Sequence, residues 1–168
     1  MSYYEITLSE EETTALGRRL GSCLQGGSVV LIDGDLGAGK TRLAQGIAEA
    51  LGVNCPVTSP TFNLVLEYPL TRGLPSLLRH FDLYRLEDPD QLEDLDYFGL
   101  LEQQDAVSVV EWGSKFAAHL PRDFIQVTLT VDQDHPHERR VELSCEGESS
   151  LVQLSRFVTA ETRMYLSD

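Results

Sequence analysis

Apolar residues recur at every third or fourth position in three segments of the chain, which is the spacing of an amphipathic helix. The first segment starts at a capping box formed by Ser9 and Glu12, and it predicts a helix over residues 9 to 25. The second predicts a helix of about three turns that ends at Gly52. The third predicts a C-terminal helical extension in residues 149 to 168. These repeats are carried by Leu16, Leu20, Leu24, Leu43, Ile47, Leu51, Leu151, Leu154 and Val158.

Short apolar runs between and after these helices predict strands. The run at 29 to 32 is continuously apolar, as in a strand that is buried on both faces of a sheet. Polar links at 69 to 76 and 132 to 140 predict two hairpins. The other predicted strands are 4 to 8, 62 to 68, 77 to 83, 106 to 110, 125 to 131 and 141 to 143. Helices that alternate with strands early and strands that pair later predict an α/β sandwich, with a mixed parallel and antiparallel sheet flanked by helices, in one domain over residues 1 to 168.

Charge and composition narrow the possible functions. The chain has 168 residues and a formal net charge of −14, so its surface repels phosphate backbones and anionic lipids. No apolar stretch approaches the roughly 20 residues of a spanning helix, and residues 1 to 12 lack the basic start of a signal peptide. The three cysteines form no CxxC pair, which fits neither a disulfide framework nor a zinc site. We therefore expect a cytoplasmic protein that neither coats nucleic acid nor binds a membrane.

The negative charge is concentrated in one segment. From Asp82 to Asp105 the sequence has nine acidic residues and one basic residue, Arg85. Asp88 followed by Pro89 predicts the start of a helix inside this segment. The acidic side chains form either a solvated helix face or a docking surface for a basic partner, and the pattern alone leaves both open.

The strongest chemical signal is a glycine-rich loop of the form GxxxxGK[ST], which lies between the strand at 29 to 32 and the following helix. Glycines let the backbone amides of such a loop point at phosphate oxygens, and the helix start adds positive potential. In this loop Lys40 would reach the phosphates, and the Thr41 hydroxyl would ligate Mg²⁺. The predicted nucleotide-binding residues are Gly34, Asp35, Leu36, Gly37, Ala38, Gly39, Lys40 and Thr41.

Hydrolysis at such a loop also needs a carboxylate for Mg²⁺ and a group that orients water. Two predicted strands end in acidic residues, Asp82 and Glu111, which are candidates for these roles. The segment 57 to 62 adds hydroxyl groups on a proline-stiffened stretch, either as a phosphate-sensing switch or as an ordinary turn.

Four motifs stand in the order and approximate spacing of a known family: GDLGAGKT at 34 to 41, SPTF at 59 to 62, HFDLYR at 80 to 85 and VEWG at 110 to 113. Over roughly residues 5 to 145, the sequence resembles the TsaE family of P-loop ATPases, the bacterial ATPase component of tRNA threonylcarbamoyladenosine synthesis. The resemblance implies a P-loop NTPase-like fold. It also implies an Mg²⁺-dependent ATPase that works with a TsaB–TsaD complex and meets tRNA only through that complex.

The resemblance also implies roles for particular residues. Thr41 and Glu111 would hold Mg²⁺, Asp82 would position or activate water, and Lys40 would contact the phosphates. We expect His80 and Arg85 to brace the loop that carries Asp82. For Trp112, a packed indole and a functional side chain remain equally open.

The same motifs also allow other nucleotide-dependent functions. A small-molecule kinase is the main alternative, because the same loop and acids could pass phosphate to a bound acceptor. An arginine-rich lid is not apparent, since only Arg79, Arg85 and Lys115 are basic between residues 73 and 121. A GTPase is disfavoured because the chain has no NKxD sequence. A nucleotide-binding module without catalysis is the third alternative.

Overall fold

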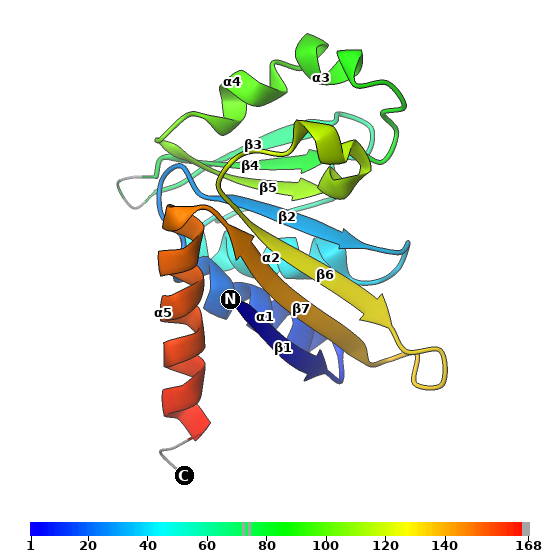
Figure 1. Cartoon of the computed structure of the whole chain (residues 1–168), viewed down its shortest axis with the longest axis vertical. Helices are drawn as coiled ribbons and strands as arrows, with labels where there is room; N and C mark the ends of the chain where they lie inside the picture. Colours follow the sequence, from blue (N-terminus) through cyan, green and yellow to red (C-terminus); the bar gives the residue numbers. More distant parts are fainter. Residues whose placement is uncertain (72, 74, 166–168) are drawn as a thin grey trace.

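The computed structural model describes residues 1–71, 73 and 75–165 and shows a seven-stranded mixed sheet (Figure 1). The strand order is β1-β7-β6-β2-β5-β4-β3. The four central strands β6, β2, β5 and β4 run parallel, and β7 and β3 pair antiparallel with β6 and β4 at the two sides. At the edge, β1 pairs antiparallel with β7. The strands are β1 (Ser2–Thr7), β2 (Val29–Gly34), β3 (Val65–Pro69), β4 (Leu77–Asp82), β5 (Ala106–Glu111), β6 (Phe124–Val131) and β7 (Arg139–Glu146). The predicted mixed sheet and both predicted hairpins are confirmed.

Helices cover both faces of this sheet and create two apolar cores. The helices are α1 (Glu10–Gly21), α2 (Lys40–Leu51), α3 (Asp90–Asp94), α4 (Tyr97–Leu101), the 3₁₀ segment η1 (Gly113–His119) and α5 (Glu148–Tyr165). One core joins the sheet to α1, α2 and α5, and the other joins it to α3, α4 and η1. In β2, Val30 and Ile32 enter the first core, whereas Val29 and Leu31 enter the second. The prediction that this strand is buried on both faces is confirmed.

Two glycines allow α1 and α2 to lie against each other. A Cβ atom at Gly17 would collide with the backbone carbonyl of Leu43, and one at Gly46 would collide with the carbonyl of Thr14. This close approach brings the start of α1 beside the glycine-rich loop at the start of α2.

Several element boundaries differ from the sequence-based expectation. The first helix ends at Gly21 instead of residue 25, although Ser9 does cap it by accepting a hydrogen bond from the Glu12 amide. The third strand begins at Val65 instead of residue 62, because Leu64 takes a left-handed φ of 64° that interrupts extended backbone. The C-terminal helix is confirmed as α5, and the expected residues 166 to 168 lie outside the described part of the chain.

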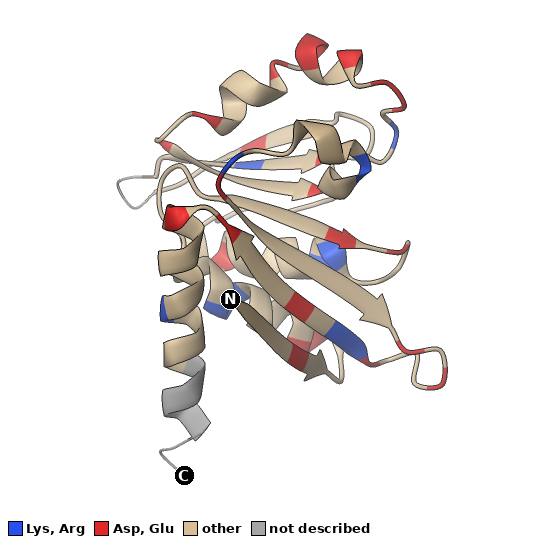
Figure 2. Cartoon of the chain, viewed as in Figure 1, with Lys and Arg blue, Asp and Glu red and all other residues tan. Residues whose placement is uncertain are grey.

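The acidic segment folds as two short helices, α3 and α4, separated at Asp96, which has a left-handed φ of 53°. Figure 2 shows acidic residues gathered over α3 and the loop before it. The described residues include no salt bridge to any acidic residue between 87 and 105. Among the described residues, no helix has the length and apolar character that a membrane crossing requires.

Candidate active site

The glycine-rich loop connects β2 to α2 in the conformation that the sequence pattern demands. Gly37 and Gly39 have φ angles of 79° and 100°, which residues with a Cβ atom rarely adopt. Gly39 is also the N-cap of α2, and no side chain caps this helix start. The free amides of the first turn and the helix dipole therefore remain available for an anion.

Lys40 lies folded against this loop. Its Nζ donates hydrogen bonds to the carbonyl oxygens of Gly34 and Asp35, at 2.7 and 2.9 Å. The same ammonium lies 4.0 Å from the ring centroid of Trp112. Burial lowers the pKa of Lys40, and the nearby carboxylates of Glu111 and other acids oppose this shift. The loop thus holds a largely desolvated cation where phosphates are expected.

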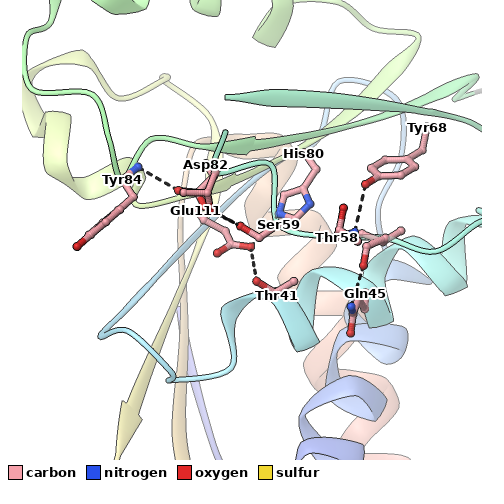
Figure 3. Close-up of polar contacts among 11 residues, drawn as sticks. Thr41, Gln45, Thr58, Ser59, Tyr68, His80, Asp82, Tyr84 and Glu111 are labelled. Atoms are coloured by element: carbon pink, nitrogen blue, oxygen red, sulfur yellow. Dashed lines mark hydrogen bonds and ion pairs between the residues drawn. The ribbon is translucent and has the colours of Figure 1, made fainter. Parts of the chain in front are cut away.

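Thr41 and Glu111, the two predicted metal ligands, are in direct contact (Figure 3). The Thr41 hydroxyl donates to Glu111 Oε1 at 3.1 Å. Oxygen donors of these two kinds suit Mg²⁺. The described residues contain no group of three His, Cys, Asp or Glu side chains that could hold a metal alone. A metal at this point would therefore need phosphate oxygens and water to complete its coordination.

Asp82 stands beside Glu111 because both residues end neighbouring parallel strands and are paired in register. Its Oδ2 accepts hydrogen bonds from the hydroxyls of Ser59, at 2.8 Å, and Thr61, at 2.7 Å. Its Oδ1 accepts from the Tyr84 amide at 3.0 Å, as Figure 3 shows. The hydroxyls of the predicted switch segment thus hold the acid expected to position water.

The segment that carries these hydroxyls is anchored at both ends. At its start, the Gln45 amide donates to the Val57 carbonyl at 2.8 Å, and the Thr58 amide donates to the Tyr68 hydroxyl at 3.3 Å. At its end, the Leu64 carbonyl accepts from the Asp82 amide at 2.9 Å. Ser59 and Thr61 lie between these anchors and reach Asp82 from a loop instead of a strand.

A cavity of about 330 Å³ joins these groups. Its lining includes Lys40, Asp82 and Glu111 as well as both hydroxyls that contact Asp82. Of the predicted phosphate-binding residues, Leu36, Gly37, Gly39, Lys40 and Thr41 line the cavity. The other three support the loop: Ala38 is buried in the core, and Gly34 and Asp35 supply the carbonyls that hold Lys40.

The two residues expected to brace the loop of Asp82 make different contacts in the structure. The His80 imidazole contacts Glu111, at 2.8 Å from Nε2 to Oε1, instead of the loop of Asp82. The Arg85 guanidinium stacks on the exposed ring of Phe62, 4.2 Å from its centroid, and does not line the cavity. This cation–π contact joins the loop after Asp82 to the segment 57 to 62, which agrees with a bracing role for Arg85.

Sequence reasoning missed three charged residues near the cavity. Glu10 and Arg42 line it and form an ion pair at 2.8 Å. Arg139, at the start of β7, donates from Nε to the Ala38 carbonyl at 3.0 Å and thereby braces the glycine-rich loop from outside. Arg42 directly follows the loop motif and could have been noticed, whereas nothing in the pattern points to Glu10 or Arg139.

The chain is similar to proteins of one family over most of its length. The family model described as "Threonylcarbamoyl adenosine biosynthesis protein TsaE" matches residues 7–141. A relative from Mycobacterium bovis, named tRNA threonylcarbamoyladenosine biosynthesis protein TsaE, is 47% identical over 124 residues, which are 71% of this chain and 73% of the relative. The Bacillus subtilis protein of that name is 36% identical over 148 residues, 83% of this chain and 89% of the relative.

A solved structure agrees with this similarity. The structure titled "Crystal structure of Bacillus subtilus YdiB" superimposes with a TM-score of 0.76 at 28% sequence identity. The match covers 96% of this chain and 97% of that one. The two proteins therefore share their overall fold over nearly the whole chain.

Proposed function

The chain belongs to the TsaE family, which acts in tRNA threonylcarbamoyladenosine biosynthesis, and from this premise we propose that it is an Mg²⁺-dependent cytoplasmic ATPase. Its hydrolysis of ATP supports a TsaB–TsaD complex, and tRNA meets the chain only through that complex. The observation that carries the ATPase proposal is the convergence of Lys40, the Thr41–Glu111 contact and Asp82 on one cavity.

The side chains divide the work of hydrolysis. Amides of residues 37 to 41 and the Lys40 ammonium bind the phosphates, since both present N–H donors to an anion. Thr41 and Glu111 hold Mg²⁺, which offsets phosphate charge when it is bound. Asp82 accepts a hydrogen bond from the attacking water and orients it toward the terminal phosphate.

Two features support dependence on a partner. Arg42 lines the cavity but is paired with Glu10, and Arg85 is stacked on Phe62. Among the described residues, an arginine that is both free of such contacts and directed at the expected terminal phosphate is therefore missing. The acidic residues of α3 and of the loop before it make no salt bridge within the described part of the chain, and they suit a basic partner surface. Hydrolysis by the isolated chain is therefore slow.

The test of nucleotide binding is calorimetry with ATP and Mg²⁺ on the wild-type chain and on Lys40→Ala. Loss of a charged donor to phosphate should weaken ATP binding roughly 10- to 100-fold. Arg18→Ala is the matched control, because it also removes one positive charge but lies in an exposed pair with Glu49. Equal ATP affinity in all three proteins would contradict the proposal.

A phosphate-release assay then separates the ATPase from the kinase alternative. An ATPase releases inorganic phosphate with water alone as acceptor. A kinase would instead consume ATP only when a small-molecule acceptor is added, and a binding module would not consume it at all.

A further inference from the structure

His80 is a buried polar residue that has no role in the proposed hydrolysis of ATP. It lies on β4, two residues before Asp82, and its side chain is 1% exposed. Its Nε2 atom is 2.8 Å from Glu111 Oε1, and Glu111 is itself 3% exposed. The other ring nitrogen, Nδ1, has no hydrogen-bond partner. The imidazole therefore makes its single side-chain hydrogen bond to the candidate metal ligand.

The contacts of Glu111 fix the direction of this hydrogen bond. A carboxylate is only an acceptor, so the proton lies on Nε2 and the imidazole donates. The Nδ1 atom has no hydrogen-bond partner, so the imidazole acts through its bond from Nε2 to Glu111.

Two donors consequently meet at one carboxylate oxygen. Glu111 Oε1 accepts from the Thr41 hydroxyl at 3.1 Å and from His80 at 2.8 Å. When Thr41 turns its oxygen to a metal ion, His80 is the donor that continues to hold the carboxylate. Such second contacts fix the orientation of ligands and usually change metal affinity 10- to 100-fold when removed.

We propose that His80 is a positioning residue for the magnesium site, which holds the Glu111 carboxylate in the orientation that receives Mg²⁺ together with the nucleotide. This inference rests on the proposed function of the cavity. His80 does not line the cavity and acts only through Glu111.

Three substitutions of His80 distinguish positioning from packing. His80→Gln places its amide nitrogen at the same number of bonds from the backbone as Nε2, so it can still donate to Glu111. His80→Asn is polar but one bond shorter, so its amide cannot reach. His80→Leu fills the space without a donor. Ser28→Ala is the control, because it loses a buried hydrogen bond to Gln153 at the opposite end of β2.

The measurement is ATP affinity by calorimetry, first in EDTA and then over a series of Mg²⁺ concentrations. In EDTA all variants should bind ATP as the wild type does, because the glycine-rich loop and Lys40 hold the phosphates. For His80→Leu and His80→Asn, the Mg²⁺ concentration that gives half of the metal-dependent gain in affinity should rise about tenfold or more. His80→Gln and Ser28→Ala should keep the wild-type midpoint.

Several results would overturn the inference. A wild-type Mg²⁺ midpoint in His80→Leu or in His80→Asn would refute it, and so would a midpoint in His80→Gln that is as high as in His80→Asn. A loss of affinity already in EDTA would show that His80 supports the phosphate loop instead. A wild-type chain that binds ATP without any effect of Mg²⁺ would overturn the proposed function as well.

Discussion

The Lys40 ammonium lies 4.0 Å from the ring centroid of Trp112, which is the one tryptophan of the sequence. Binding of ATP should draw Lys40 from the loop carbonyls and the indole toward the phosphates. We therefore expect tryptophan fluorescence to change on titration with ATP and to stay constant with adenosine, which has no phosphates. Trp112→Phe should lose the signal and still bind ATP by calorimetry. Unchanged fluorescence at saturating ATP would contradict this movement.

Replacing Asp82 or Glu111 by its amide should impair different steps, hydrolysis in the first case and Mg²⁺ binding in the second. Asp82→Asn should bind ATP with Mg²⁺ nearly normally, while its hydrolysis rate falls roughly 100-fold or more, because the acid that orients water is lost. Glu111→Gln should instead shift the Mg²⁺ dependence of ATP binding. The two variants are compared by ATP binding over a series of Mg²⁺ concentrations and by single-turnover hydrolysis rates. Identical Mg²⁺ titration curves for the two variants would refute the assignment.

ATP hydrolysis should be slow in the isolated chain and faster with TsaB–TsaD and tRNA. An arginine supplied by a partner raises the rate of other P-loop enzymes by roughly 10³ to 10⁵. Steady-state phosphate release by the chain alone, with the complex, and with the complex plus tRNA measures this effect. Rapid turnover without partners and no stimulation by them would point to an independent enzyme.

The exposed acids of α3 should accelerate association with a basic partner surface. Glu93→Lys with Asp94→Lys should slow association with TsaB–TsaD and flatten its dependence on salt, because both side chains are exposed and steering acts over long range. The control reverses two exposed acids of β7, Glu142 and Glu146, with the same change of charge. Equal association rates for both double variants across a salt series would mean that the face of α3 is only solvated.

Asp123 should stabilise the start of α5 in a pH-dependent way. Partial burial raises the pKa of Asp123, but hydrogen bonds from the Ser150 hydroxyl and from the Ser149 and Ser150 amides outweigh it and leave the pKa below its ordinary value. A lowered pKa in the folded state gives stability that is present above the unfolded-state value and is lost as pH falls through the folded-state value.

Asp123→Ala should therefore lower the free energy of unfolding by about 1 kcal/mol at neutral pH, the usual cost of losing such a helix cap. This difference in the free energy of unfolding between the variant and the wild type should shrink in acid. Urea unfolding of both proteins at several pH values measures the difference. A difference that is constant with pH would argue against the charged carboxylate as its source.

The parts of the fold that depend on local pattern could be predicted from the sequence. The strand, glycine loop and helix from residue 29 to 51 follow from periodicity and glycine spacing within one segment. The position of Asp82 and Glu111 at strand ends was also predicted, whereas their pairing in register is a finding of the structure.

Other features depend on tertiary contacts that no local pattern records. Arg139 reaches the Ala38 carbonyl across 101 residues of sequence. The left-handed φ of 64° at Leu64 shortened a predicted strand, although leucine does not favour that conformation. His80 was assigned to the wrong neighbour, since strand register decides that it contacts Glu111.

The pairing of Asp82 with Glu111 on adjacent strands limits how activity at this cavity can be adjusted. Neighbouring strands keep a spacing of about 4.8 Å, so the two acids cannot move apart without breaking the sheet. Ser59 and Thr61 have more freedom, because they belong to a loop and are joined to Asp82 only through hydroxyl hydrogen bonds. Substitutions that alter the rate of the proposed hydrolysis without altering the proposed Mg²⁺ affinity are therefore expected in the loop, with both strands unchanged.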